Sequence, residues 1–339
     1  MTASTMRGMP GQEEAVAPLP WRRMAWVTWR QHRPTLISVP ATLAALGAFL
    51  LIAGLRIHHA YAVLTACRPA NSATCQSLNS QFNSTDWTLA NTVLILLNIA
   101  PALIGAFAGA PVLARELETG TYRYAWTQGF GRVRWTVAKL TLIAVTVTAA
   151  AGAFSQLFAW FFQPFLRQED MSVLSATVFG TRGISFAAWT LAAFAIGALL
   201  GMLIRRIVPA IVATLGAYAG LGILTWLFLR EHYLPPAVTS DPRVTSGFLA
   251  PDSPWILSSW YTGPGGGRVS QSAIDRLLGN RQFPGGSAQY LSQHGYTWWA
   301  SYLPASRFWP LQLVEGGWLL ALSVLVIAAT AWLVRHRAA

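Results

Sequence analysis

The chain has 339 residues, of which 54% are hydrophobic and only 11% are charged, whereas soluble domains average about 25% charged residues. This shortage of charge excludes an ordinary soluble protein and indicates helices embedded in lipid. The net charge of +12 would suit a nucleic-acid-binding protein, but such proteins gather Lys and Arg on one soluble face. Here the arginines flank apolar runs, so we expect membrane lipid and no nucleic acid as a partner.

The N-terminal residues 1–33 are expected to lie in the cytoplasm. Residues 21–33 alternate tryptophans with arginines, among them Trp26, Trp29 and Arg30, as is typical of an elbow helix that lies in the membrane interface. A simple basic flank before the first span is the alternative. A cleaved signal peptide is not expected, because more than thirty residues precede the first apolar run.

Six apolar stretches are long enough to cross a membrane, which takes about 20 helical residues. Their sole charged residue is Glu315, near one end of the last stretch. The fold class is therefore an all-α polytopic membrane protein with six transmembrane helices, of which the fourth and fifth form a tight hairpin at Arg205-Arg206. Residues 34–229 hold the first five helices and 313–339 the last one with a short tail. The stretches are approximately 35–55, 89–113, 140–162, 183–204, 207–229 and 313–334.

The distribution of arginine sets the expected orientation, because positive residues beside short loops stay in the cytoplasm. Basic residues are dense in 1–33, in the loop 114–139, at Arg205-Arg206 and in the tail. Both termini are thus predicted to be cytoplasmic. The long loop 230–312, which precedes the last helix, is predicted to be extracellular.

Both cysteines fall in the first predicted extracellular loop. Cys67 and Cys75 close a short loop in an oxidising compartment, where a disulfide is the expected state. Free thiols are one alternative. A metal site that adds His58 and His59 is another, although the spacing matches no established zinc pattern.

The loop 230–312 is long enough to form a small subdomain. Its residues 270–278 place apolar side chains at helical spacing, which predicts a short amphipathic helix. Aromatic residues lead from the loop into the last span, and we interpret them as an interfacial belt, with a substrate gate as the alternative. The residues assigned to this gate or interface are Tyr302, Arg307, Phe308, Trp309 and Glu315, with Trp298 and Trp299 just before them.

No catalytic chemistry is recognisable. All six histidines lie outside the spans, no HExxH motif occurs, and no span contains an aspartate. Ion-coupled transporters usually place carboxylates near the bilayer midplane, and none is found there. The glycine-rich run before Arg268 lacks the lysine of a P-loop. We expect no catalytic residue, cofactor or metal in this chain, so an active transporter built from it needs energy from another polypeptide.

The segment between the second and third spans carries the coupling hypothesis. It reads Arg115-Glu116-Leu117-Glu118-Thr119-Gly120-Thr121 and ends in a basic stretch at Lys139. Here the sequence resembles the permeases of type-2 ABC transporters, and residues 26–33 and 304–310 look like actinobacterial members. The resemblance implies that Arg115, Glu116, Glu118, Gly120 and Thr121 dock on an ATPase subunit. A solvated loop whose arginines only fix topology is the alternative.

Glycine and asparagine residues within the spans indicate either close packing of the helices or a polar transport pathway between them. Gly105 and Gly109, Gly197 and Gly201, and Gly216 and Gly220 form pairs that let helices approach closely, and in the resembled family the last pair could lie at a dimer seam. Asn91 and Asn98 share one helix face, where they either bond between helices or line a polar vestibule.

These features predict the permease subunit of an ABC exporter for a hydrophobic or amphipathic compound. Its partners would be cytoplasmic ATPase subunits, which bind ATP and Mg, and a second permease subunit, identical or homologous. A non-transporting receptor or scaffold that binds through 230–312 is the alternative. An enzyme acting on lipid-linked substrates is disfavoured because acids and histidines do not cluster at one membrane face.

Overall fold

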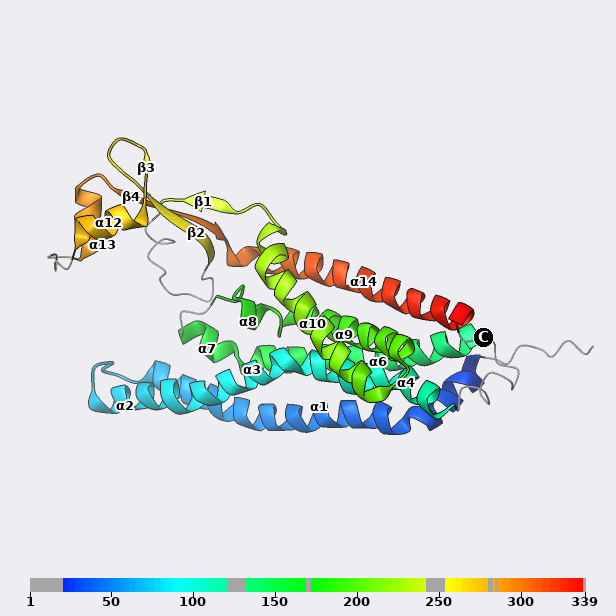
Figure 1. Ribbon diagram of the computed structural model, residues 1–339. Coiled ribbons are helices and arrows are strands. Elements are labelled where there is room, and N and C mark those ends of the chain that lie inside the picture. Colours follow the sequence, from blue (N-terminus) through cyan, green and yellow to red (C-terminus); the bar gives the residue numbers. More distant parts are fainter. Residues whose placement is uncertain are drawn as a thin grey trace, which may run out of the picture.

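Within the part of the chain that the structure describes, six helical segments are long and apolar enough to cross a membrane, which confirms the predicted six-span helical fold. Figure 1 shows them packed side by side in an elongated bundle. The computed structural model describes residues 21–120, 132–168, 172–241, 254–279, 283 and 286–337. The six segments are Ile37–Ala66, Ala73–Thr119, Val133–Phe161, Gly183–Ile204, Ile207–His232 and Ala305–His336.

The two ends of the bundle differ. A small sheet projects from one end, which we call the sheet end, and the C-terminus lies at the other, which we call the terminal end (Figure 1). The second span and the hairpin at Arg205 both reach the terminal end.

The first span belongs to one long helix, α1 (Trp21–Ala66), which is unbroken over 46 residues. Residues 21–33, expected as an interfacial elbow helix, are its first turns, and Pro34 follows them within the same helix. In Figure 1 these turns, in dark blue, are angled away from the rest of the helix.

The second span is assembled from helical pieces that follow one another without a gap. Its turns η1 and η2 are π-helical, and η2 lies between Pro101 and Pro111. Proline removes a backbone donor, and a wider turn accommodates the disturbed ladder. The pieces are α2 (Ala73–Gln81), η1 (Phe82–Asp86), α3 (Trp87–Ile104), η2 (Gly105–Gly109) and α4 (Ala110–Thr119).

The fourth span, α9, is the central helix of the bundle. It contacts α3, α4, α6, α10 and α14 and is the most buried of the six, whereas α10 is the least buried. Arg205, in the left-handed conformation at φ 60°, and the extended Arg206 join α9 to α10 in a tight hairpin, as expected. The helices are α6 (Arg132–Phe161), α7 (Gln163–Gln168), α8 (Ala176–Phe179), α9 (Gly183–Ile204), α10 (Ile207–Leu224), η3 (Thr225–Leu229), η4 (Arg230–His232), η5 (Ala305–Arg307) and α14 (Phe308–Arg337).

Glycines allow the second span to cross α9 in backbone contact. A Cβ added to Gly105 would lie 2.6 Å from the carbonyl oxygen of Ala193, and one added to Gly197 would lie 2.8 Å from the backbone nitrogen of Ala110. The packing role expected of these glycines, and of Gly109 and Gly201 beside them, is therefore confirmed. The pair in α10 differs, because a Cβ on Gly216 or Gly220 would meet no atom within 4 Å.

The loop 230–312 contains an antiparallel sheet that the sequence did not predict. The strand order is β1-β4-β2-β3, and β4 is central, pairing with both β1 and β2. The expected helix at 270–278 is present as α12, with Ile274 buried. The elements are β1 (Ala237–Thr239), β2 (Trp255–Thr262), β3 (Arg268–Val269), α12 (Gln271–Leu278), α13 (Ser287–Gln293) and β4 (Thr297–Leu303).

Three of the aromatic residues that we interpreted as an interfacial belt belong to the sheet. Trp298, Trp299 and Tyr302 lie on β4. The Trp298 ring stacks on Tyr261, and the Trp299 indole donates a hydrogen bond of 3.0 Å to Thr262 Oγ1. These rings hold neighbouring strands together, as aromatic cross-strand pairs do. Phe308 and Trp309 remain at the start of the last span.

Candidate functional site

The terminal end of the second span carries the residues expected to couple to an ATPase. α4 ends at Thr119, and Gly120 follows with φ 71°, a left-handed conformation that glycine adopts without strain. Arg115 is exposed on the last turns of α4. Thr121 lies outside the described residues.

Glu116 is held by its own chain. The Lys139 ammonium at the start of the third span donates to Glu116 Oε1 at 2.7 Å and to the Val112 carbonyl at 2.6 Å. The Lys139 side chain is fully buried. A buried ammonium needs such partners because desolvation is costly. Glu116 therefore ties α4 to α6, and its carboxylate is not a free contact for a partner protein.

Glu118 links the expected coupling segment to the α9–α10 hairpin. Its Oε2 accepts a hydrogen bond of 3.0 Å from the backbone N–H of Ile207, the first residue of α10. A carboxylate at this position satisfies an otherwise unpaired N–H and interacts favourably with the positive end of the helix dipole. Movement of the α4 end would thus act directly on α10.

A buried ion pair at the sheet end joins the fifth and sixth spans. Arg230 donates from Nε to Glu315 Oε2 at 3.1 Å and from Nη2 to Glu315 Oε1 at 3.0 Å. The Trp189 indole of α9 donates to Glu315 Oε1 at 2.9 Å. Glu315 is fully buried, and its carboxylate is satisfied by this two-point contact and the indole. One cluster therefore fixes α9, the end of the fifth span and α14 relative to one another.

The surroundings of the ion pair are aromatic. The Arg230 guanidinium lies 4.6 Å from the centre of the Phe179 ring. Tyr233, just beyond the fifth span, accepts a hydrogen bond of 2.8 Å from the Trp318 indole. Burial, reinforced by the nearby Glu315 carboxylate, raises the pKa of Tyr233, so this hydroxyl stays protonated at physiological pH.

A cavity of about 370 Å³, which we call the Arg230 cavity, opens beside this pair. Asn98, expected on a pathway or packing face, lines it and donates to the carbonyls of Leu94 and Thr177 at 2.8 and 3.1 Å. Asn91 does not line it, and neither do Gly216 and Gly220. The cavity therefore combines aromatic walls with a few polar groups, as small-molecule sites do. Its lining is Leu97, Asn98, Pro101, Ala176, Thr177, Gly180, Trp189, Tyr218, Gly222, Trp226 and Arg230.

The residues assigned to a gate or interface lie between the sheet and the last span. Arg307 donates from Nη1 to the carbonyl of Pro235, which joins the connection entering the sheet to the one leaving it. The Phe308 ring packs edge-on against Phe179 at 5.7 Å, and Trp309 is 57% exposed. Tyr302 pairs with Ala237 and Ile256 inside the sheet. Only Glu315 of this group reaches the ion pair.

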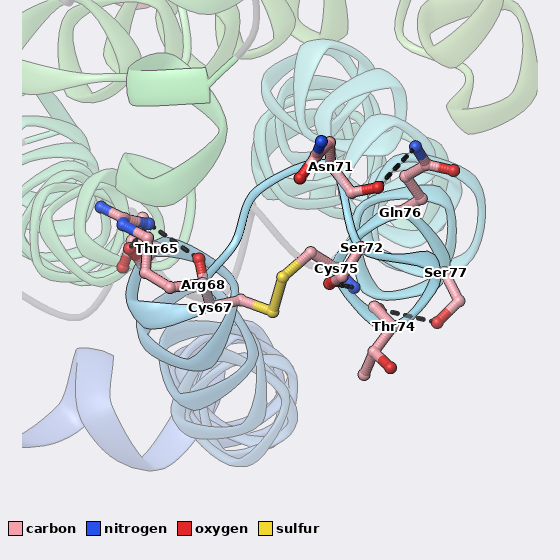
Figure 2. The surroundings of a disulfide bond; sticks show 9 residues. All are labelled: Thr65, Cys67, Arg68, Asn71, Ser72, Thr74, Cys75, Gln76 and Ser77. Carbon is pink, nitrogen blue, oxygen red and sulfur yellow. Dashed lines mark hydrogen bonds between the residues drawn. A yellow bond between two sulfur atoms is a disulfide. The ribbon is translucent and has the colours of Figure 1, made fainter.

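Cys67 and Cys75 form a disulfide that ties the end of α1 to the first turn of α2. Figure 2 shows the bond, with the Ser72 hydroxyl accepting from the Cys75 N–H at the helix start. The metal alternative with His58 has no support within the described residues, where no group of three ligating side chains gathers. His58 instead stacks on Trp160, and its Nε2 lies 3.0 Å from the carbonyl of that residue.

Residues 40–230 match a protein family described as ABC-2 membrane transporter related. The chain belongs to the ABC-2 membrane transporter related family. The match runs from the first span to Arg230 and thus covers the coupling segment and one half of the buried ion pair. No curated protein and no solved structure matches the chain. A multi-pass membrane protein of the ABC-2 family is a permease, typically a transmembrane subunit without catalysis that associates with an ABC ATPase.

Proposed function

We propose that the chain is the membrane-spanning subunit of an ATP-driven exporter in the plasma membrane, moving a hydrophobic or amphipathic compound. The ATP and Mg would be bound by separate cytoplasmic ATPase subunits. Membership in the ABC-2 family supports the permease role. The absence of a P-loop from the sequence supports an external energy source.

The proposed orientation places the terminal end in the cytoplasm and the sheet outside the cell. Arg115, Arg205 and Arg206 are exposed at the terminal end, and exposed arginines beside short connections favour the cytoplasmic side. The disulfide lies toward the other side, where an oxidising compartment would keep it intact.

The contact between Glu118 and Ile207 is the observation that carries the coupling proposal. An ATPase that binds the α4 end would push on the first turn of α10. α10 is a continuous helix, and its later residues Tyr218 and Gly222 line the Arg230 cavity. Nucleotide-driven movement at one end of the helix would thereby change the cavity at the other end, as rigid helices transmit small displacements.

The Arg230 cavity is the proposed contact site for the transported compound. Its aromatic rings suit an apolar body, and Asn98 and Arg230 offer polar contacts for a head group. The open face of α10 around Gly216 and Gly220 is the proposed seam with a second permease subunit, because closely packed membrane helices use small residues.

The decisive experiment reconstitutes the chain in nanodiscs with its ATPase and compares two charge reversals. Glu118→Arg is expected to insert normally but to lower co-purification of the ATPase and substrate-stimulated ATP hydrolysis by at least about tenfold, the equivalent of about 1.4 kcal/mol. Glu231→Arg makes the same charge change at an exposed position of the sheet end and is expected to behave like wild type. Unchanged assembly and hydrolysis for Glu118→Arg would contradict the coupling role.

A receptor or scaffold without transport is the second candidate, favoured by the folded sheet that projects from the bundle. The same reconstitution separates the two functions. A scaffold would bind its ligand through the sheet and leave ATP hydrolysis unstimulated, whereas an exporter would show hydrolysis that rises with its transported compound.

A further inference from the structure

A second cavity lies apart from the Arg230 cavity, where the third, fourth and sixth spans approach the sheet. Its volume is about 380 Å³. Its walls come from α6, from the connection before α8, from the start of α9, and from η5 with the first turn of α14. We call it the Arg182 cavity. Its lining is Gln156, Ala159, Val173, Arg182, Gly183, Ala305, Ser306, Phe308 and Trp309.

Arg182 in this cavity lacks the partners that other buried cations in the protein have. Its Nε is buried and makes no hydrogen bond, and no carboxylate among the described residues pairs with it. Lys139 and Arg230, by contrast, each have a carboxylate within 3.0 Å. Burial lowers the pKa of Arg182, yet a guanidinium stays charged at neutral pH. A half-buried guanidinium with an unsatisfied donor calls for an anion.

The other lining groups also suit an anion with an apolar tail. Gln156 and Ser306 are exposed side chains that can donate hydrogen bonds, and none of the described residues that line the cavity is acidic. Phe308 and Trp309 supply apolar surface beside them. An arginine with neutral donors around it is the usual arrangement for phosphate recognition.

The position of the cavity indicates the source of that anion. Arg182 directly precedes the span Gly183–Ile204, and Trp309 lies in the first turn of α14. Both residues therefore sit where the apolar segments end, which is the level of lipid head groups, and tryptophan favours this level. Trp309 is 57% exposed, so the cavity opens to the outside of the bundle.

We propose that the Arg182 cavity binds the phosphate of an anionic membrane phospholipid. The phosphate would pair with the Arg182 guanidinium, with Gln156 and Ser306 as further donors, and the acyl chains would lie along Trp309. The bound lipid would contact α6, α9 and α14 together and so would stabilise the base of the sheet. This site is independent of the transport proposal.

The test uses the full chain and native mass spectrometry after exchange into mixed phosphatidylglycerol and phosphatidylcholine. Wild type is expected to retain phosphatidylglycerol about tenfold over phosphatidylcholine. Arg182→Met should abolish that preference, and Arg182→Lys should restore part of it. Arg206→Met removes an exposed arginine at the terminal end and is the matched control, expected to keep the preference. An Arg182→Met protein with the wild-type preference would overturn the proposal.

Two further arms keep the test decisive. If Arg182→Met does not fold, Gln156→Leu at an exposed position is expected to weaken the preference about threefold, and no change would count against the site. Inorganic phosphate at millimolar concentration is expected to leave the lipid bound. Displacement of the lipid by phosphate would assign the site to a free anion and overturn the lipid proposal. ATP hydrolysis is not a readout in any arm, so failure here leaves the exporter proposal standing.

Discussion

Arg230 and Glu315 hold opposite charges against each other inside two membrane-spanning segments. Both side chains are withdrawn from the protein surface, since Glu315 is fully buried and Arg230 is 5% exposed. Removing one partner strands the other charge, whereas removing both leaves an apolar contact. The pair is therefore expected to matter more for the relative placement of the fifth and sixth spans than for the net free energy of unfolding.

Single and double substitutions of this pair should differ in their effect on the free energy of unfolding. Arg230→Met or Glu315→Gln alone is expected to destabilise the protein by about 3–5 kcal/mol, because an uncompensated or poorly paired group stays buried. The double variant Arg230→Met/Glu315→Met should be more stable than either. Thermal unfolding followed by size-exclusion chromatography measures the order, and a double variant no better than the singles would contradict it.

Lys139 gives a second test at the residue scale. Lys139→Met leaves the Glu116 carboxylate without its cation and the Val112 carbonyl without a donor, which should cost about 2–4 kcal/mol. Glu116→Gln should cost less, because Lys139 keeps the Val112 carbonyl and the amide oxygen of glutamine replaces the carboxylate oxygen as its second acceptor. The same unfolding assay measures both variants, and wild-type stability for Lys139→Met would show that this ion pair does not stabilise the α4–α6 contact.

Sequence reasoning found some of these residues but not their pairing. Glu315 stood out as the sole charge within the predicted spans. Its partner Arg230 was placed in the loop, one residue beyond the predicted end of the fifth span, although a charge buried in the membrane requires a partner. The two residues are 85 positions apart, and no periodic pattern in the sequence would bring them together. The orphaned donor of Arg182 is likewise visible only in three dimensions.

At the scale of helices, glycine marks two kinds of surface. Gly197 touches the backbone of the second span, and Gly216 faces open space. Each of them belongs to a pair of glycines four positions apart, so the sequence alone could not tell the packed glycine from the open one. The sheet was missed for a related reason: its short strands lie among Pro and Gly residues, a composition that indicates loops, and its register depends on long-range pairing between β2 and β4.

Bulky substitutions should separate these surfaces. Gly197→Leu must push α9 away from Ala110 and is expected to destabilise the monomer by more than about 3 kcal/mol, as overpacked cores do. Gly216→Leu should leave the stability of the monomer within about 0.5 kcal/mol of wild type. Unfolding in detergent at low protein concentration measures the monomer. A tolerated Gly197→Leu would contradict the backbone contact.

For the whole molecule, orientation is the property most open to a direct test. Ser272→Cys lies in α12 of the sheet subdomain, and Arg206→Cys lies in the hairpin at the terminal end, both at exposed positions. The native cysteines form a disulfide and stay unreactive. A membrane-impermeant maleimide applied to intact cells is expected to label Ser272→Cys, and to label Arg206→Cys only after permeabilisation. The reverse pattern would invert the proposed topology.

The sheet is attached to the bundle through the fifth and sixth spans, and the Arg230–Glu315 pair and the Arg307–Pro235 contact join these two attachments at its base. A body held in this way follows the tilt of its two supports. β2 has 8 residues, which at about 3.3 Å per residue extend roughly 26 Å. A tilt of about 10° at the base would then sweep the far end of the strand through roughly 5 Å. A small tilt of the two supporting helices in the membrane would therefore produce a larger displacement at the far end of the sheet. A distance measured between a label on the sheet and one on the bundle would detect this displacement.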